Sequence, residues 1–273
     1  MCGIAGMIDL TGAGVVPESV LEDMAQALFH RGPDEDGSLM QPGIALASRR
    51  LSIVGLLDGR QPLSNEDESV SVVFNGELFD YPEVRNELRA RGHRLHTHCD
   101  TEILPHFYED HGEAMFAKLR GQFAIALWDA PKRRLLLARD RFGICPLYWT
   151  RQTDATGDWL LFASEIKALL ASGMVEAVPD PRGINHAFTF FALPGPVTCF
   201  RGIQLLLPGH YLTIQPADGR QAARVIERVY WEIDFPDRGQ EEPGRDACRV
   251  TDEFEALMLK AVERRLRADV PVV

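Results

Sequence analysis

The stretch Cys2-Gly3-Ile4-Ala5-Gly6-Met7-Ile8 follows the initiator methionine and places a cysteine at the head of an apolar run. The run has the length and composition of a buried strand, which we predict for residues 2–8. A small residue at position 2 usually permits removal of Met1, which would leave Cys2 with both a thiol and a free α-amine. A model α-amine has a pKa of about 8, so part of it is free base at neutral pH and can accept the thiol proton. Cys2 is therefore either a nucleophile that carries its own base or a chance cysteine, and its neighbours in the sequence decide.

Composition and charge exclude several classes of protein. The 273 residues are 45% hydrophobic and 25% charged, as in an ordinary soluble protein. The net charge is −11, and no segment gathers a basic patch, so nucleic acid is not expected as a partner. No apolar run reaches the roughly 18 residues of a membrane helix, and the first thirty residues lack the pattern of a signal peptide. We therefore expect a cytoplasmic protein without a membrane partner.

Runs of apolar or alternating residues predict strands at 2–8, 44–54, 69–74, 122–128, 134–138, 159–163 and 210–214. Helical patterns lie at 17–28, 82–91, 101–110 and 164–170. Many links between strands are short and turn-like, which favours antiparallel hairpins over repeated βαβ units. We therefore expect an α+β fold in which sheets pack on each other and helices cover their outer faces.

The character of the chain changes after residue 235. Residues 237–245 form a polar stretch that is typical of a linker, and an amphipathic helix is predicted from Thr251 to Leu266. The segment from Asp269 to Val273 resembles the opening of a buried strand. The apolar face of this helix needs a covering surface, from the same domain or from another copy, if the helix is to be ordered.

Ordered blocks through most of the chain resemble the glutaminase half of the class II amidotransferases, which are N-terminal nucleophile hydrolases, and more narrowly the asparagine synthetase group. The first blocks are Cys2-Gly3-Ile4-Ala5-Gly6, His30-Arg31-Gly32-Pro33-Asp34, Arg50-Leu51-Ser52-Ile53-Val54, Asn75-Gly76-Glu77 and Asp100-Thr101-Glu102. The narrower likeness rests on Arg139-Asp140-Arg141-Phe142-Gly143, Pro146-Leu147-Tyr148, Ser164-Glu165-Ile166-Lys167-Ala168-Leu169-Leu170 and Leu207-Pro208-Gly209-His210-Tyr211.

The resemblance implies a four-layer αββα sandwich of two mainly antiparallel sheets flanked by helices, with a C-terminal helical extension. Residues 1–235 would be the glutaminase domain, 236–250 a linker, and 251–273 the first helix and strand start of a truncated synthetase domain. The S-G-G-x-D-S loop that holds ATP in synthetases does not occur in this sequence. ATP and magnesium would therefore belong to an absent domain, and no metal or cofactor is expected for the glutaminase step.

The resemblance also assigns roles to eight residues. Cys2 would be the nucleophile, and the Asn75 side-chain amide and the Gly76 N–H would form an oxyanion hole. Arg50 would hold the α-carboxylate of glutamine, while Glu77 and Asp100 would receive its α-ammonium group. Leu51 and Ile53 would contribute backbone contacts beside Arg50.

Taken without the resemblance, Arg50, Asn75-Gly76 and Asp100 each also have a purely structural interpretation. Arg50 follows Arg49 and either could be a solvated strand residue. Asn75-Gly76 is a strong hairpin-turn signal. Asp100 could cap the helix that begins near Thr101.

His93, His96 and His98 lie close together in the sequence, alternate residues of a strand share a face, as His96 and His98 would, and histidine is a common metal ligand. Since no further ligand stands at zinc-like spacing, a solvated edge strand is the better account.

The five scattered cysteines form no C-x-x-C pair, so neither a disulfide framework nor a zinc site is indicated. Two positions depart from the family pattern: Cys145 stands where lysine is usual and Asp80 where asparagine is common, and both could affect the glutamine loop or contacts between domains.

The leading hypothesis is an enzyme that hydrolyses L-glutamine to glutamate and ammonia through a Cys2 glutamyl thioester. It would supply ammonia to a synthetase domain or subunit for asparagine-type amide synthesis, and it could form a homodimer. A second hypothesis keeps the glutaminase but changes the acceptor of the ammonia. A third makes the chain a glutamine-binding regulatory module whose hydrolysis is vestigial.

Overall fold

A computed structural model describes residues 1–12, 14–154, 157–240, 244 and 246–271 of the chain. Its centre is a pair of six-stranded sheets in which every strand pairing is antiparallel. The first sheet has the order β10-β8-β9-β1-β3-β2, and the second has the order β12-β11-β7-β6-β5-β4. The strands are β1 Gly3–Asp9, β2 Glu35–Gln41, β3 Ile44–Arg50, β4 Leu63–Ser64, β5 Val70–Leu78, β6 Gly121–Asp129, β7 Arg134–Arg139, β8 Tyr148–Asp154, β9 Gly157–Ala163, β10 Ile203–Leu205, β11 His210–Gln215 and β12 Arg224–Val229.

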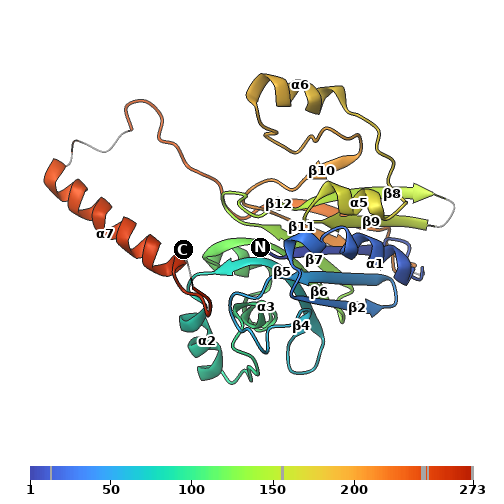
Figure 1. The fold of residues 1–273 in the computed structure, drawn as a ribbon, viewed down its shortest axis with the longest axis horizontal. Coiled ribbons are helices and arrows are strands. Elements are labelled where there is room, and N and C mark those ends of the chain that lie inside the picture. The colour runs from blue at the N-terminus through green and yellow to red at the C-terminus, as the bar shows by residue number, and fades with distance from the viewer. Residues whose placement is uncertain (13, 155–156, 241–243, 245, 272–273) are drawn as a thin grey trace.

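Helices cover the outer face of each sheet (Figure 1). Helices α1 (Glu18–Gln26) and α5 (Ile166–Ala171) pack on the first sheet, and α2 (Tyr81–Ala90), α3 (Ile103–His111) and α4 (Met115–Lys118) pack on the second. Short 3-10 helices complete the body: η1 Phe29–Arg31, η2 Asp100–Glu102 and η3 Gly112–Ala114. The predicted α+β sandwich of two antiparallel sheets between helices is therefore confirmed.

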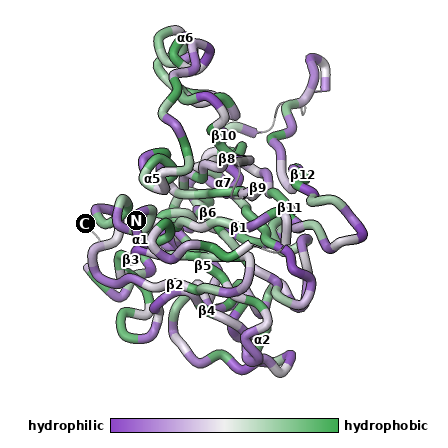
Figure 2. Tube along the Cα trace, turned by 90° about the vertical axis from the view of Figure 1, so that its right-hand side faces the viewer, coloured by the Kyte–Doolittle hydropathy of each residue, from purple (hydrophilic) through white to green (hydrophobic). Residues whose placement is uncertain are grey.

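The hydropathy of the strands follows from these layers. The central strands of both sheets carry hydrophobic residues, whereas the peripheral loops are largely hydrophilic (Figure 2). Strand β1 is buried along its whole length because alternate side chains enter different layers: Ile4 and Ile8 face the second sheet, and Ala5 and Met7 face the helices. A strand covered on both faces is expected to be apolar throughout, which explains the pattern that marked residues 2–8.

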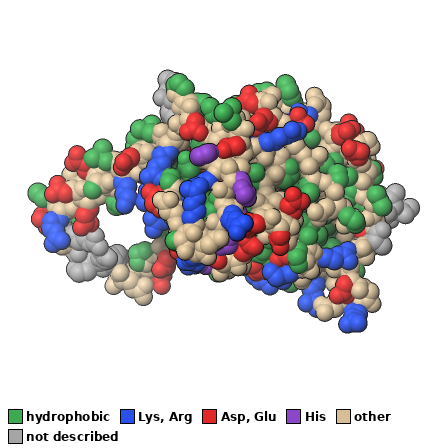
Figure 3. Space-filling view, turned by 90° about the horizontal axis from the view of Figure 1, so that it is seen from below, with side chains coloured by type: hydrophobic (Ala, Val, Ile, Leu, Met, Phe, Trp, Pro, Cys, Tyr) green, Lys and Arg blue, Asp and Glu red, His purple; other side chains and the backbone are tan. Residues whose placement is uncertain are grey.

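Two further helices lie outside the layers. Helix α6 (Pro181–Phe190) stands above the first sheet, and α7 (Ala247–Arg265) extends from the body on the side of α2 (Figure 1). Helix α7 has no buried residue, and its apolar side chains are exposed together with charged ones (Figure 3).

Of the C-terminal strand predicted at 269–273, residues 269–271 are not in a strand, and 272–273 lie outside the described residues. Within the part of the chain that is described, no helix is both long and apolar enough to cross a membrane.

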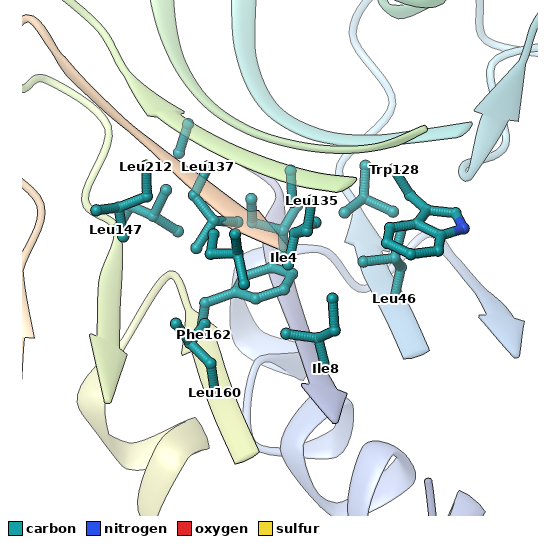
Figure 4. Packing of buried hydrophobic residues seen from close by; sticks show 14 of the residues in the cluster. Ile4, Ile8, Leu46, Trp128, Leu135, Leu137, Leu147, Leu160, Phe162 and Leu212 are labelled. Atoms are coloured by element: carbon teal, nitrogen blue, oxygen red, sulfur yellow. The ribbon is translucent and has the colours of Figure 1, made fainter. Parts of the chain in front are cut away.

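The hydrophobic layer between the sheets is the main core (Figure 4). It joins Ile4 and Phe162 of the first sheet to Leu135, Leu137 and Leu212 of the second, and all five side chains are almost completely buried. Two sheets packed face to face in this way lie about 10 Å apart. The position of any group on one sheet relative to the other is therefore set by this layer.

The structure corrects several local predictions. The sequence patterns did not predict β2, β4, β8, β10, β12, α4 or α6; β2 is a polar edge strand whose residues alternate between partial burial and exposure. The strand predicted at 44–54 ends at Arg50, where the chain leaves β3 for an irregular loop. Residues 93–98 do not form the predicted edge strand. Helix α7 begins at Ala247, before the predicted Thr251, and part of the predicted linker, residues 241–243 and 245, lies outside the described residues.

Candidate active site

One pocket collects most of the predicted site residues. Its lining includes Cys2, Arg50, Leu51, Ile53, Gly76, Glu77 and Asp100 from the predicted set, together with Met1, Val54, Gln61, Phe74, Cys99, Thr101 and Gln122. These residues come from the start of β1 and the end of β3 in the first sheet, from β5 and β6 in the second, and from η2. The pocket therefore lies where the ends of the two sheets meet.

Cys2 precedes β1 at this junction. Its Sγ lies 3.7 Å from the carbonyl oxygen of Leu51, and Arg31 Nε donates to the Cys2 carbonyl at 2.8 Å. Burial raises the pKa of the Cys2 thiol, so the thiol needs a base to become a nucleophile. While Met1 is attached, the nitrogen of Cys2 belongs to a peptide bond and cannot accept a proton. Removal of Met1 is therefore a condition for the mechanism predicted from the sequence.

Arg50 is buried, with 3% of its surface exposed, so the solvated-strand alternative is wrong. Its Nη2 donates to the carbonyl oxygens of Val54 and Gly55 at 2.7 and 2.8 Å. Its Nη1 pairs with Glu35 and donates to Ser52 Oγ at 3.0 Å. These bonds hold the loop that follows β3 around the guanidinium group. Contact with a substrate carboxylate stays a prediction, and it would require Arg50 to exchange some of these partners.

Asn75 lies inside strand β5, opposite Ala124 of β6, so the hairpin-turn alternative for Asn75-Gly76 is also wrong. The residue is fully buried, yet neither its side-chain oxygen nor its nitrogen has a hydrogen-bond partner among the described residues. A buried amide without partners costs about 1–3 kcal/mol, and such groups are uncommon in folded proteins. Asn75 is the one predicted residue that does not line the pocket itself.

Gly76 is required by the close approach of β6. A Cβ atom added to Gly76 would lie 2.1 Å from the carbonyl oxygen of Gln122 and 2.8 Å from Phe123 Cα. Both atoms belong to backbone, which cannot move aside as a flexible side chain could. The absence of a side chain therefore lets β5 pair closely with β6 at the point where Gly76 borders the pocket.

Glu77 and Asp100 bring two carboxylates to the same pocket, and neither forms an ion pair with a described residue. Burial, and then the charge of Asp100, raise the pKa of Glu77 to about 7. Burial also raises the pKa of Asp100. Asp100 is not the N-cap of η2 or α3, neither of which has a side-chain capping bond, contrary to the third alternative, and its Oδ2 accepts the Leu78 N–H at 2.9 Å. The charge of Arg265 acts on Glu77 in the opposite direction, but Arg265 forms no ion pair with it, and two neighbouring carboxylates without an ion-pair partner favour a ligand that carries a positive charge.

Three polar residues of the pocket were not predicted: Gln61, Thr101 and Gln122. Gln61 links strand β5 to η2, because its Oε1 accepts the Phe74 N–H at 2.7 Å and its Nε2 donates to Thr101 Oγ1 at 3.3 Å. Gln122 Nε2 lies 3.5 Å from a carboxylate oxygen of Glu77. Gln61 and Gln122 lie outside the sequence blocks that carry the resemblance, and Thr101 belongs to one of them but was given no role. Only the folded chain brings the three residues together.

The C-terminal segment reaches the pocket loop. Asp269 accepts the Gly55 N–H at 2.8 Å and donates its own N–H to the Ile53 carbonyl at 2.9 Å. Arg264 Nε lies 3.1 Å from Asp80, the residue that departs from the family pattern, so this change affects contact with the C-terminal segment. Cys145, the second departure, is buried in the layer between the sheets.

Comparison with known proteins agrees with this geometry. A family model described as a glutamine amidotransferase domain matches residues 1–231. The chain is 34% identical to asparagine synthetase [glutamine-hydrolyzing] 1 of Bacillus subtilis, over 100% of this chain and 41% of the relative. It is also 34% identical to amidase chyE of Penicillium rubens, over 100% of this chain and 40% of that protein. It thus spans about two fifths of the length of these curated relatives.

Among solved structures, the fold is similar to that of the glutamine phosphoribosylpyrophosphate amidotransferase from Bacillus subtilis. The TM-score is 0.60 at 17% identity, over 84% of this chain and 49% of that one. At this identity the likeness concerns the fold alone. The family match and the identity to the synthetases carry the assignment: the chain belongs to the glutamine amidotransferase family and corresponds to the glutaminase half of glutamine-hydrolysing asparagine synthetases.

Proposed function

We propose that this chain hydrolyses L-glutamine to L-glutamate and ammonia, with Cys2 as the nucleophile. The observation that carries the proposal is the composition of one pocket, in which a thiol just before β1 lies with two carboxylates that form no ion pair with a described residue. Glutamine is a zwitterion with a carboxamide at its far end. A site for it needs negative charge for the α-ammonium group and a nucleophile for the amide, and the pocket offers both.

The reaction would proceed in two stages. After removal of Met1, the Cys2 α-amine would take the thiol proton, and Sγ would attack the side-chain carbonyl carbon of glutamine. The negative charge on the carbonyl oxygen would be stabilised by the Asn75 amide and the Gly76 N–H. The C–N bond would then break, the proton would pass to the leaving nitrogen, and ammonia would leave a glutamyl thioester. Water would add to the thioester and release glutamate and the thiol.

None of these steps needs a metal or cofactor, so we propose that the glutaminase reaction uses none. The first-named relatives are asparagine synthetases, and this favours asparagine-type amide synthesis as the use of the ammonia, by a synthetase domain or subunit in the cytoplasm. ATP and magnesium would belong to that part. The similarity to amidase chyE keeps a different acceptor as the second candidate.

Replacement of Cys2 tests the proposal directly. Purified wild-type protein should release glutamate from glutamine, and intact mass should show that the active species has lost Met1. Cys2→Ala should release no glutamate above background while still binding glutamine in calorimetry. Cys199→Ala is the matched control, because Cys199 is another partly buried free cysteine and lies outside the pocket. Glutamate release by Cys2→Ala at the wild-type rate, or full activity in protein that retains Met1, would exclude this mechanism. A wild-type protein that binds glutamine without hydrolysing it would instead be the regulatory module.

A further inference from the structure

A second group of chemically reactive side chains lies outside the lining of the glutamine pocket, beside α2 and α3, which cover the second sheet (Figure 1). It consists of Glu66 in the turn between β4 and β5, His93 after α2, and His106 and Glu109 one turn apart on α3. One ligand atom from each residue lies within 4.8 Å of the others. We call these four residues the His93–His106 cluster.

The distances within the cluster are those of a metal site. His106 Nδ1 lies 3.3 Å from Glu66 Oε2 and 3.6 Å from Glu109 Oε2. His93 Nδ1 lies 3.6 Å from Glu109 Oε2 and 3.9 Å from Glu66 Oε1. In a tetrahedral zinc site with bonds of about 2.0–2.1 Å, neighbouring ligand atoms are about 3.4 Å apart. The four side chains therefore need only small movements to surround one ion.

His106 provides an independent indication of a ligand. Its side chain is 1% exposed, and neither ring nitrogen has a hydrogen-bond partner among the described residues. The contacts with Glu66 and Glu109 do not have hydrogen-bond geometry. A buried imidazole is ordinarily satisfied by a carbonyl, a carboxylate or water, because an unpartnered polar group is costly. An ion held by Nδ1 would supply one of the two missing interactions.

Groups outside the cluster orient its ligands. His93 Nε2 lies 3.2 Å from Asp110 Oδ1, which turns Nδ1 toward the cluster. Asn65 Nδ2 donates to Glu109 Oε1 at 2.9 Å, and the Arg94 N–H donates to Glu66 Oε1 at 2.7 Å. Each of the two carboxylates thus has one oxygen engaged by a donor and the other facing a histidine. A carboxylate behind a ligating histidine is a recurrent feature of metal sites.

We propose that the His93–His106 cluster binds one divalent transition-metal ion, for which zinc is the best fit. Two imidazoles and two carboxylates match its ligand preference, and four protein ligands leave no open position, as in structural sites. Glu66 and Glu109 are each about one third exposed, with side-chain values of 33% and 34%, so an ion can enter. The metal would join the β4–β5 turn, the segment after α2, and α3, which directly follows the η2 helix that carries Asp100.

This site differs from the one considered from the sequence. Of His93, His96 and His98, only His93 belongs to the cluster, and His98 pairs with Asp58 instead. His106 stands 13 residues after His93, across the connection between α2 and α3. The proposal does not involve the glutaminase reaction, which we expect to run without the metal.

The test uses the whole protein, freed of metal with a chelator and then titrated with zinc chloride. Wild-type protein should take up one equivalent by elemental analysis, and zinc should raise its Tm. Glu109→Gln and His93→Gln should bind at least about tenfold more weakly and lose the Tm increase. Asp110→Asn should keep the ligands but weaken binding by about 10- to 100-fold. His98→Gln, a histidine on the same segment but outside the cluster, should behave as wild type.

Cobalt(II) distinguishes this site from binding by cysteine. A tetrahedral site of nitrogen and oxygen ligands gives visible d–d bands without the intense near-ultraviolet sulfur-to-cobalt charge-transfer band. The spectrum should therefore persist in Cys2→Ala and vanish in Glu109→Gln. A sulfur charge-transfer band, less than a tenth of an equivalent of bound zinc, or equal affinity in wild type and Glu109→Gln would each overturn the proposal.

Discussion

The backbone N–H of Leu78 donates a hydrogen bond to Asp100 Oδ2 at 2.9 Å, and this bond ties the end of β5 to the η2 helix. Strand β5 carries Asn75, Gly76 and Glu77, while η2 carries Asp100. One carboxylate thus both faces the pocket and fixes the strand that bears three other predicted site residues. Substitutions at these residues can separate the contribution of the Asp100 charge to glutamine binding from its contribution to the position of β5.

Asp100→Asn should weaken glutamine binding and lower kcat/KM, because the amide offers no negative charge to the α-ammonium group. The amide oxygen can still accept the Leu78 N–H, so the protein should remain folded, with its Tm within a few degrees of wild type. Steady-state kinetics and thermal unfolding on the same preparations check both statements. A normal KM in a folded Asp100→Asn protein would contradict the binding role.

Asn75→Ala should lower kcat by about 10²–10³-fold with little change in KM, as expected for loss of one oxyanion donor. Because both polar atoms of the Asn75 side chain are unpartnered in the free protein, its removal should not reduce the free energy of unfolding by breaking hydrogen bonds. Ser48→Ala is a matched control, since Ser48 Oγ is also buried without a partner among the described residues, and Ser48 lies in β3 and is not one of the predicted site residues. A loss of activity of the same size in both variants would argue for a packing effect.

Gly76→Ala should reduce stability as well as activity, because its Cβ would meet the β6 backbone at Gln122 and Phe123. The expected loss is at least the roughly 1–3 kcal/mol of an overpacked site. Chemical unfolding measures it. Gly92→Ala is an informative comparison, because nothing lies within 4 Å of the added atom, although the positive φ of 101° at Gly92 causes some strain of its own.

The pH dependence of glutamine binding should report Glu77. Its pKa is raised to about 7 in the free protein, so the carboxyl becomes neutral as the pH falls through 7. Since the α-ammonium group binds the ionised form, KM should increase about tenfold per pH unit below this value. Glu77→Gln should have a high KM that no longer changes over this range. An unchanged pH profile in Glu77→Gln would assign the titration to another group.

The raised pKa of Glu77 also makes the stability of the folded protein depend on pH. A carboxyl whose pKa is higher in the folded than in the unfolded state binds its proton more tightly when folded. Glu77 therefore reduces stability as the pH rises from about 4.5 to 7, and this cost remains above 7. Glu77→Gln should raise Tm more at pH 8 than at pH 4.5.

Asp269→Ala should weaken glutamine binding, although Asp269 does not line the pocket. It removes the carboxylate that accepts the Gly55 N–H, on the loop whose carbonyls hold Arg50. We expect KM for glutamine to increase severalfold while kcat changes less. Asp252→Ala, an exposed acidic residue on α7, is the control for a change in charge alone. Equal kinetics for Asp269→Ala and wild type would show that the loop keeps its shape without this contact.

The sequence predicted the layers well because strands β1, β5, β6 and β7 are apolar on both faces, and this signal is strong. It did not predict β2, whose polar residues lie at a sheet edge, where pairing with β3 rather than hydrophobicity determines the structure. The Asn75-Gly76 dipeptide shows the opposite case, since a strong local turn preference is overridden by pairing with β6. Gln61, Asp269 and His106 gave no signal because their partners are distant along the chain, and only tertiary packing selects them.

In the proposed mechanism the two sheets contribute different parts of the chemistry: Cys2 directly precedes β1 of the first sheet, and Asn75 lies in β5 of the second, with β1 and β5 in contact across the sandwich. Because the two residues lie on different sheets, no single helix or strand fixes the distance between the thiol and the amide. The side chains packed between the two sheets keep the sheets apart. Their size therefore sets the distance between the Cys2 thiol and the Asn75 amide. Since a displacement of about 1 Å can cost about 10²-fold in rate, catalysis should tolerate less change in Ile4, Phe162 or Leu137 than folding does.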